Sequence, residues 1–151
     1  MALARSWALA KVVAQIRIPM YPQILNPQRG DILVGWIRNE RARNFALFTI
    51  QAPIAVSLEG FVFRLDERLL RAVEKWRLAT GVAPNIVNMV STTYNAFDGH
   101  RLGDPEPWSN GLVFPLGLRE SFHPNCRGDI SIATLVLQNL GHPVPVGEWL
   151  C

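Results

Sequence analysis

Cysteine is scarce in this 151-residue chain, which has only Cys126 and Cys151. Two cysteines provide no disulfide framework, so we expect a reducing compartment and a cytoplasmic location. No apolar run reaches the length that crosses a bilayer, so the sequence predicts no membrane span. The formal net charge is a mild +3, and no basic stretch is dense enough to indicate nucleic-acid binding.

Apolar residues are what the sequence has in quantity, at 49% of the chain. At this length they suffice to bury one hydrophobic core, so we expect a single domain over residues 1–151. The N-terminal stretch is interrupted by Arg5 and Lys11 and lacks the apolar segment and cleavage site of a signal peptide. Its apolar residues recur at helical spacing, which predicts an amphipathic helix over residues 3–17.

Residues 19–65 favour extended structure. Pro19, Pro22 and Pro27 end the predicted helix and indicate an extended connector. Short runs of strand-forming residues follow at 32–37, 45–50 and 60–65. Because these runs are close together in the sequence, we expect them to pair as an antiparallel meander.

A second helix is predicted over residues 66–80, where Asp66 is a suitable N-cap and Gly81 a suitable stop. Residues 91–111 are rich in Ser, Thr, Asn, Asp, Gly and Pro, which predicts a long loop. A loop of that length inside one domain is usually functional or an insertion. Strands or buried extended segments are expected at 112–118 and 130–137. The expected fold class is therefore α+β, with about four strands.

The densest patch of chemically active side chains covers residues 122–129, Phe-His-Pro-Asn-Cys-Arg-Gly-Asp. Three interpretations stay open. In the first, Cys126 is a nucleophile with His123 or His100 as its base. In the second, Cys126 and the histidines at 100, 123 and 142 bind a metal ion, but the usual ligand spacing is missing and we expect no metal site. In the third, the His and Asn side chains lock a tight turn by bonding to the backbone.

Two stretches of the chain resemble the ubiquitin-conjugating enzyme (E2) family, in the family's order. Residues 50–53, Ile-Gln-Ala-Pro, and 58–65, Leu-Glu-Gly-Phe-Val-Phe-Arg-Leu, are similar to the family's I-x-G-P and Y-E-G-G-x-F-x-L. Residues 122–125, Phe-His-Pro-Asn, are identical to the family's F-H-P-N. Residues 128–135, Gly-Asp-Ile-Ser-Ile-Ala-Thr-Leu, are similar to its G-x-I-C-L-x-x-L.

The resemblance implies a UBC-like α+β domain: an N-terminal helix, the antiparallel meander, an insertion at about 66–111 that carries a helix, and a long active-site loop. An E2 accepts the C-terminus of a ubiquitin-like protein as a thioester on a cysteine and passes it to an amine. Ser131 stands at the position of that cysteine. The resemblance further implies that Asn125 stabilises the charged intermediate and that His123 holds the loop in place.

A serine at position 131 is a far weaker nucleophile than a cysteine. Three explanations stay open: Ser131 is an engineered substitution that traps a stable ester, the protein is an inactive variant that binds a ubiquitin-like partner, or Cys126 has taken over the thiol role. The resemblance implies a ubiquitin-like protein and an E1-like activating enzyme as partners. It implies no cofactor, and a bacterial antiphage defence system is the context it suggests.

A different class of function also fits part of the sequence. Residues 123–127, His-Pro-Asn-Cys-Arg, resemble a motif of phage minor head proteins, which implies a non-enzymatic assembly component. Trp108 lies in a proline-rich loop and is a candidate exposed anchor for a partner protein. Neither nucleic acid nor a membrane is among the expected partners.

Overall fold

The computed structural model describes residues 14–39, 44–111 and 121–144, with the backbone alone for residues 34–39 and 44–48. These residues form both helices and strands, so the mixed α and β content expected from the sequence is confirmed. In chain order the elements are β1 (Ile16–Pro19), the 3-10 turn η1 (Pro27–Arg29), β2 (Ile32–Asn39), β3 (Asn44–Ile50), α1 (Ala52–Thr80), β4 (Val87–Val90), the 3-10 turn η2 (Ser91–Asn95) and α2 (Cys126–Asn139).

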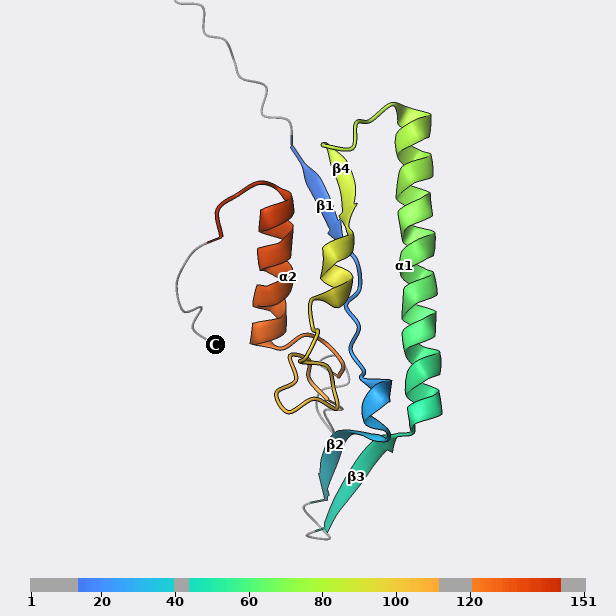
Figure 1. The fold of residues 1–151 in the computed structure, drawn as a ribbon, viewed down its shortest axis with the longest axis vertical. Helices are drawn as coiled ribbons and strands as arrows, with labels where there is room; N and C mark the ends of the chain where they lie inside the picture. Colours follow the sequence, from blue (N-terminus) through green and yellow to red (C-terminus); the bar gives the residue numbers. More distant parts are fainter. Residues whose placement is uncertain (1–13, 40–43, 112–120, 145–151) are drawn as a thin grey trace, which may run out of the picture.

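A short parallel pair of strands stands at the centre of the fold. β1 pairs with β4 in the register Ile16↔Val87 to Pro19↔Val90. Figure 1 shows this pair between the two helices, with α1 on one side and α2 on the other. Parallel neighbours need a long crossover connection. Here the crossover consists of the β2–β3 hairpin at one end of the molecule and the long helix α1, which returns the chain to β4 (Figure 1).

The hairpin of β2 and β3 confirms the two strands predicted at 32–37 and 45–50. The strands are antiparallel, and the register runs from Ile32↔Ile50 to Asn39↔Asn44 with one irregularity between Leu33 and Gly35. Each strand is a little longer than predicted. The pair is not joined to β1 and β4, because the described strands form two separate two-stranded sheets.

Helix α1 corrects two predictions. The expected strand at 60–65 is wrong, and Asp66 is not an N-cap, because the helix already begins at Ala52. Leu58, Phe61 and Leu65 recur at intervals of three and four residues, which suits a helix as well as a strand run. The expected end of the helix is confirmed, since Gly81 adopts the left-handed conformation (φ 70°) that closes it.

The meander of about four strands is therefore wrong, because two of its members are helical. Residues 130–137 belong to α2, where Asn125 caps the first turn and Asp129 lies within it. A short apolar run does not distinguish a buried strand from a buried helix. In the predicted helix 3–17, Ile16 and Arg17 instead belong to β1.

Two other predicted segments fall outside the described residues, namely residues 3–13 of the N-terminal helix and the extended segment at 112–118. The predicted loop at 91–111 is mostly irregular, although it begins with η2. Strand β4, immediately before it, was not expected from the sequence. Four residues carry too little pattern to be recognised without their partner strand.

The connector after β1, residues 20–26, crosses the inner side of α1 and is held there by two carboxylates. Glu59 Oε1 accepts hydrogen bonds from the backbone N–H groups of Ile24 (3.0 Å) and Leu25 (2.7 Å). Asp66 Oδ1 accepts one from the N–H of Tyr21 (3.0 Å). The connector thus satisfies backbone donors with helix side chains where a sheet would use a neighbouring strand.

One cluster of the hydrophobic core lies where the connector, the hairpin and the start of α1 meet. Four buried residues form it, and partly buried apolar residues pack around them. The buried residues are Leu25, Ile32, Ala55 and Leu102, and the residues around them are Ile24, Ile50 and Phe122. Because Ala55 and Glu59 are one turn apart on α1, the apolar core and the carboxylate anchor share one helix face.

Burial raises the pKa of both anchoring carboxyls. For Glu59 this effect outweighs the hydrogen bonds from Leu25 and Ile24 and the nearby charge of Arg101, which lower its pKa. For Asp66 it outweighs the hydrogen bond from Tyr21. One oxygen of each carboxyl, Glu59 Oε2 and Asp66 Oδ2, is buried without a hydrogen-bond partner. An ionised carboxylate is costly in such a place.

The raised pKa of Glu59 predicts a pH-dependent stability. The folded chain binds this proton more tightly than the unfolded chain does, so the associated stability is present below the unfolded pKa and is lost as the pH rises through the folded pKa. Glu59→Gln keeps an acceptor oxygen and cannot ionise. In thermal melts between about pH 4.5 and pH 8, we expect the variant to gain in melting temperature relative to the parent chain as the pH rises.

Two further variants give this test its controls. Glu59→Ala removes the acceptor of two backbone donors, and we expect it to cost about 2–4 kcal/mol of unfolding free energy. Glu74→Gln changes an exposed glutamate of the same helix. We expect the melting temperature of this variant to stay close to that of the parent chain at every pH. A melting-temperature difference between Glu59→Gln and the parent chain that does not change with pH would contradict the assignment.

Candidate functional site

The His-Pro-Asn segment lies against the loop that precedes it by some fifteen residues, just before α2. Ser109 and Pro124 form an antiparallel bridge. The N–H of Asn110 donates to the carbonyl of His123 (2.8 Å), and the N–H of Asn125 donates to the carbonyl of Trp108 (2.9 Å). The two segments therefore form a short ladder that sets where α2 begins.

Asn125 is the N-cap of α2, and both Oδ1 and Nδ2 of its side chain form hydrogen bonds within the fold. Its Oδ1 accepts from the backbone N–H groups of Arg127 (3.1 Å) and Gly128 (3.2 Å). Its Nδ2 donates to the carbonyl of Pro107 (2.9 Å). The cap satisfies donors that a helix start leaves unpaired, and Asp129 in the first turn suits the positive end of the helix dipole. The amide thus joins the helix to the loop.

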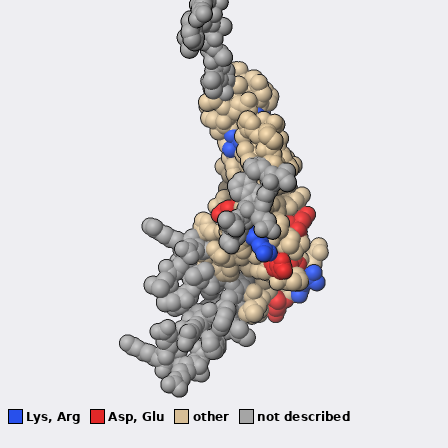
Figure 2. Space-filling view, turned by 90° about the vertical axis from the view of Figure 1, so that its left-hand side faces the viewer, with Lys and Arg blue, Asp and Glu red and all other residues tan. Residues whose placement is uncertain are grey.

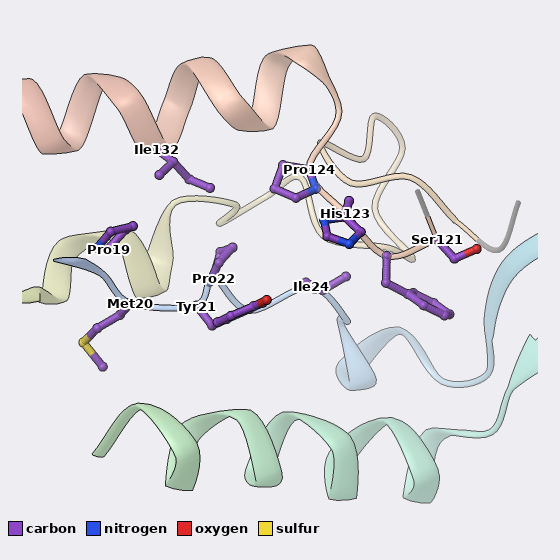
Figure 3. Close-up of a pocket in the computed structure, with 10 residues that line it drawn as sticks. Pro19, Met20, Tyr21, Pro22, Ile24, Ser121, His123, Pro124 and Ile132 are labelled. Carbon is purple, nitrogen blue, oxygen red and sulfur yellow. The ribbon is translucent and has the colours of Figure 1, made fainter. Parts of the chain in front are cut away.

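His123 is exposed, and its ring lines a cavity of about 370 Å³. In Figure 3 the connector forms one wall of this cavity, and Pro124 with Ile132 of α2 forms the other. The lining is mainly apolar and consists of Pro19, Met20, Tyr21, Pro22, Ile24, Ser121, Phe122, His123, Pro124 and Ile132. The cavity thus brings together His123 and the connector, but neither Asn125 nor Ser131 lines it.

Phe122 has a φ of 61°, the only positive value among the described residues other than glycine. This conformation is strained for a bulky side chain. The phenyl ring packs against the core cluster of Leu25 and Ile32. The strain is therefore held by core packing at the residue just before the His-Pro-Asn motif.

Ser131 lies on α2, six residues after Asn125, and is half-buried. Its hydroxyl donates to the carbonyl of Ala96 (3.0 Å). A backbone carbonyl accepts a hydrogen bond but does not act as a general base. This contact ties α2 to the segment that follows η2.

Cys126 is the first residue of α2 and is disulfide-bonded. In this state its sulfur is not a thiol, so the structure offers no support for the alternative in which Cys126 acts as the nucleophile. The reducing compartment expected from the low cysteine count stays a prediction.

His100 and Trp108 stabilise the loop by stacking on each other, with ring centroids 3.8 Å apart and an angle of 4° between the rings. His100 Nδ1 also contacts the carbonyl of Glu106 (3.0 Å). Trp108 is half-buried, so the structure uses it to pack the loop. In the part of the chain that the structure describes, no three His, Cys, Asp or Glu side chains gather as metal ligands would.

Asp104 anchors the same loop to the connector. Its Oδ1 accepts from Asn26 Nδ2 (2.9 Å) and Arg29 Nε (3.3 Å), and its Oδ2 accepts from the N–H of Arg101 (2.9 Å). Burial raises the pKa of this carboxyl, but the bonds from Asn26, Arg101 and Arg29 and the charge of Arg29 together lower it below its ordinary value. Asp104 is therefore held as a carboxylate, with a structural role.

The face that carries α2 shows acidic and basic side chains beside one another (Figure 2). Two ion pairs near the start of α2 join Arg127 to Glu106 (3.3 Å) and Arg101 to Asp98. Charges mixed in this way give no one-signed patch on the visible described surface that would attract a nucleic acid.

Three residues have contacts that the sequence did not predict: Glu59 and Gly128, for which no role of their own was expected, and Asp66, which was expected to be an N-cap. Glu59 and Asp66 are seven residues apart and share a helix face with Ala55, so acidic residues on an apolar face were the available signal. Gly128 is buried against Phe97 and the carbonyl of Trp108. Only the folded structure shows that contact.

No protein-family model, curated protein or solved structure matches the chain. Among the described residues, no helix combines the length and the apolar character needed to cross a bilayer. The arguments about function therefore depend on the contacts of the described residues and on the sequence resemblances given above.

Gly128 predicts a steric test of the junction between α2 and the loop. A Cβ at this position would lie 2.2 Å from the carbonyl oxygen of Trp108 and 2.9 Å from Phe97 Cζ, so backbone must move. We expect Gly128→Ala to lower the unfolding free energy by about 3 kcal/mol, as measured by urea denaturation.

Gly60→Ala is the matched control for this substitution. A Cβ at position 60 meets only Arg64 Nη1, at an ordinary distance of 3.7 Å. Alanine is also the better helix former, so we expect a gain of about 0.8 kcal/mol. Equal effects of the two alanines would show that α2 does not pack against Trp108 as described.

Proposed function

We propose that the protein is a non-catalytic subunit of a larger protein assembly. The observation that carries this proposal is the engagement of Asn125. Both polar atoms of its amide are used within the fold, Oδ1 by the first turn of α2 and Nδ2 by the carbonyl of Pro107. An amide in that position builds structure, and of its groups only the second N–H of Nδ2 has no bond within the fold that could compete with a reaction intermediate.

The sequence resemblance at residues 123–127 supports the same class of function. The motif is similar to one in phage minor head proteins. This similarity implies a component that acts by assembling with other chains. In this chain the motif joins the loop at 107–110 to the start of α2.

Transfer of a ubiquitin-like protein, with an E1-like activating enzyme as partner, stays a prediction from the E2 resemblance, as does an inactive variant that binds the ubiquitin-like protein. Among the described contacts, none supplies the hydroxyl of Ser131 with a base, since its hydrogen bond goes to the carbonyl of Ala96. We therefore propose assembly as the function, and a charging assay tests the transfer of a ubiquitin-like protein.

Substitutions at Asn125 separate a capping role from a catalytic one. Asn125→Asp keeps an oxygen that accepts from Arg127 and Gly128, whereas Asn125→Ala removes it. We expect the alanine variant to lose about 1–2 kcal/mol of unfolding free energy and the aspartate variant to lose clearly less. If both variants melt like the parent chain, Asn125 is not needed as a cap and the main argument for a structural role is lost.

A charging assay tests the transfer prediction. The chain and its Ser131→Cys variant are incubated with ATP and with the E1-like enzyme and ubiquitin-like protein encoded by neighbouring genes. We expect no covalent adduct on either form. An authentic E2 with its own E1 shows in parallel that the conditions support charging. A reductant-sensitive adduct on the cysteine form alone would overturn the proposal in favour of an E2-like carrier.

A further inference from the structure

Helix α1 has a second apolar face that the described structure leaves largely exposed. Its inner face, with Ala55, Glu59 and Asp66, is buried. A neighbouring row of large apolar side chains is between 38% and 61% exposed, although such side chains are usually buried. The row consists of Ile54, Leu58, Phe61, Leu65, Leu69 and Trp76. We call it the outer stripe.

The outer stripe has a regular spacing. Its members and Ala72 follow one another at intervals of 4, 3, 4, 4, 3 and 4 residues, so Ile54, Leu65 and Trp76 are each eleven residues apart. An eleven-residue repeat over three turns matches the period of an almost straight helix, so the stripe keeps to one side along about 33 Å of α1. Repeats of this kind are typical of helices that pack along another helix.

The stripe belongs to a helix at the edge of the molecule, and its member Leu58 also lines a cavity of about 230 Å³ beside Ile24 and Leu25. Figure 1 shows α1 at one side of the fold, with β1, β4 and α2 all on its other side. Exposed apolar surface of this extent marks an interaction site on most proteins that are otherwise well folded. The stripe is therefore a candidate docking surface, and its charged border indicates the chemistry of a partner.

One border of the stripe is basic. Four exposed basic residues each come one position before a residue of the stripe or Ala72. They are Arg64, Arg68, Arg71 and Lys75, which precede Leu65, Leu69, Ala72 and Trp76 in turn. The four charges therefore run beside the stripe along the same side. Among the described residues, the one salt bridge of this row joins Arg71 to Glu67 at 3.8 Å, and it is exposed. Such a pair contributes little, so the row stays positive.

The basic row argues against a second copy of the chain as the occupant. In an antiparallel pair of identical helices the same border of each helix meets its counterpart, which would place arginines opposite arginines. In a parallel pair the basic border of one helix would meet the inner border of the other, where the connector and Asp66 are already packed. Neither arrangement gives complementary charges.

We propose that the outer stripe of α1 binds an amphipathic helix of a different protein, with an apolar face and acidic residues along its border. The apolar row contributes the buried area, and Phe61 and Trp76 are the aromatic anchors. The basic row sets the orientation and speeds the encounter. This inference deepens the proposed function by giving the chemistry of the assembly partner.

The first test uses three fluorescein-labelled peptides and the full chain. One peptide is a 24-residue helix with leucines at the 4-3-4 spacing and glutamates along both borders. The second has lysines in place of the glutamates, and the third has the composition of the first in scrambled order. By fluorescence anisotropy we expect the acidic helix to bind about tenfold more tightly than either control peptide, with an affinity that falls as salt increases.

Surface variants connect the binding to the stripe. Phe61→Ala with Leu65→Ala removes apolar contacts while keeping good helix formers, and we expect about tenfold weaker binding of the acidic peptide. Arg64→Glu with Arg68→Glu should weaken that binding by a similar factor and favour the lysine peptide. Leu78→Ala is the control, because Leu78 is 85% exposed and lies off the stripe. Circular dichroism verifies that every variant is folded.

Other occupants give different results. Equal binding of the acidic and lysine peptides, or no effect of the Arg64/Arg68 variant, would overturn the acidic partner. Self-association that the Phe61/Leu65 variant abolishes would assign the stripe to a second copy. Binding to vesicles of anionic phospholipid without binding to the acidic peptide would assign it to a membrane surface. The charging assay does not depend on the peptide, self-association or vesicle measurements. Failure of the docking inference can therefore be distinguished from failure of the proposed function.

Discussion

The fold depends on the way α1 holds the connector that follows β1. The connector has no neighbouring strand over residues 21–25, so its backbone donors must find other acceptors. Glu59 and Asp66 supply them from the inner face of α1. On the opposite side the connector bonds to the backbone of Tyr94 and Leu102. Two carboxylates thus position β1 for its pairing with β4, at the cost of burying acidic groups in an apolar place, which is why burial raises the pKa of both.

The His-Pro-Asn motif shows how the same residues serve chemistry in one fold and architecture in another. In an E2-like reading Asn125 faces a reacting acyl group. In this structure its amide caps α2 and bonds to the preceding loop, while Ser131 faces the carbonyl of Ala96. The stack of His100 on Trp108 and the ion pair of Asp104 with Arg29 stabilise that loop. Such a junction gives α2 a defined start and direction, which a subunit of an assembly needs as much as an enzyme does.

Helix α1 divides its surface into two apolar faces with different uses. The inner face packs on the connector and carries the two anchoring carboxylates. The outer stripe stays largely exposed in the described structure and has arginines and a lysine along one border. A helix of 29 residues with one partner face and one open face is what a small domain needs to join a larger body while keeping its own core.

Sequence alone determined the features that depend on neighbouring residues. The hairpin strands, the helix over 66–80 and its end at Gly81 follow from local spacing and from glycine's access to positive φ. Tertiary structure decided the rest. Residues 58–65 and 130–137 suit either a strand or a helix locally, and only the folded structure shows both as helical. In it Glu59 bonds to the connector and Ser131 bonds to the segment after η2. The pairing of β1 with β4 joins residues about seventy positions apart, and the burial of Glu59 and Asp66 depends on a connector some forty residues earlier in the chain. Long-range packing of this kind leaves no periodic signal in a single sequence, and for that reason only the folded chain shows that Asn125 is a cap.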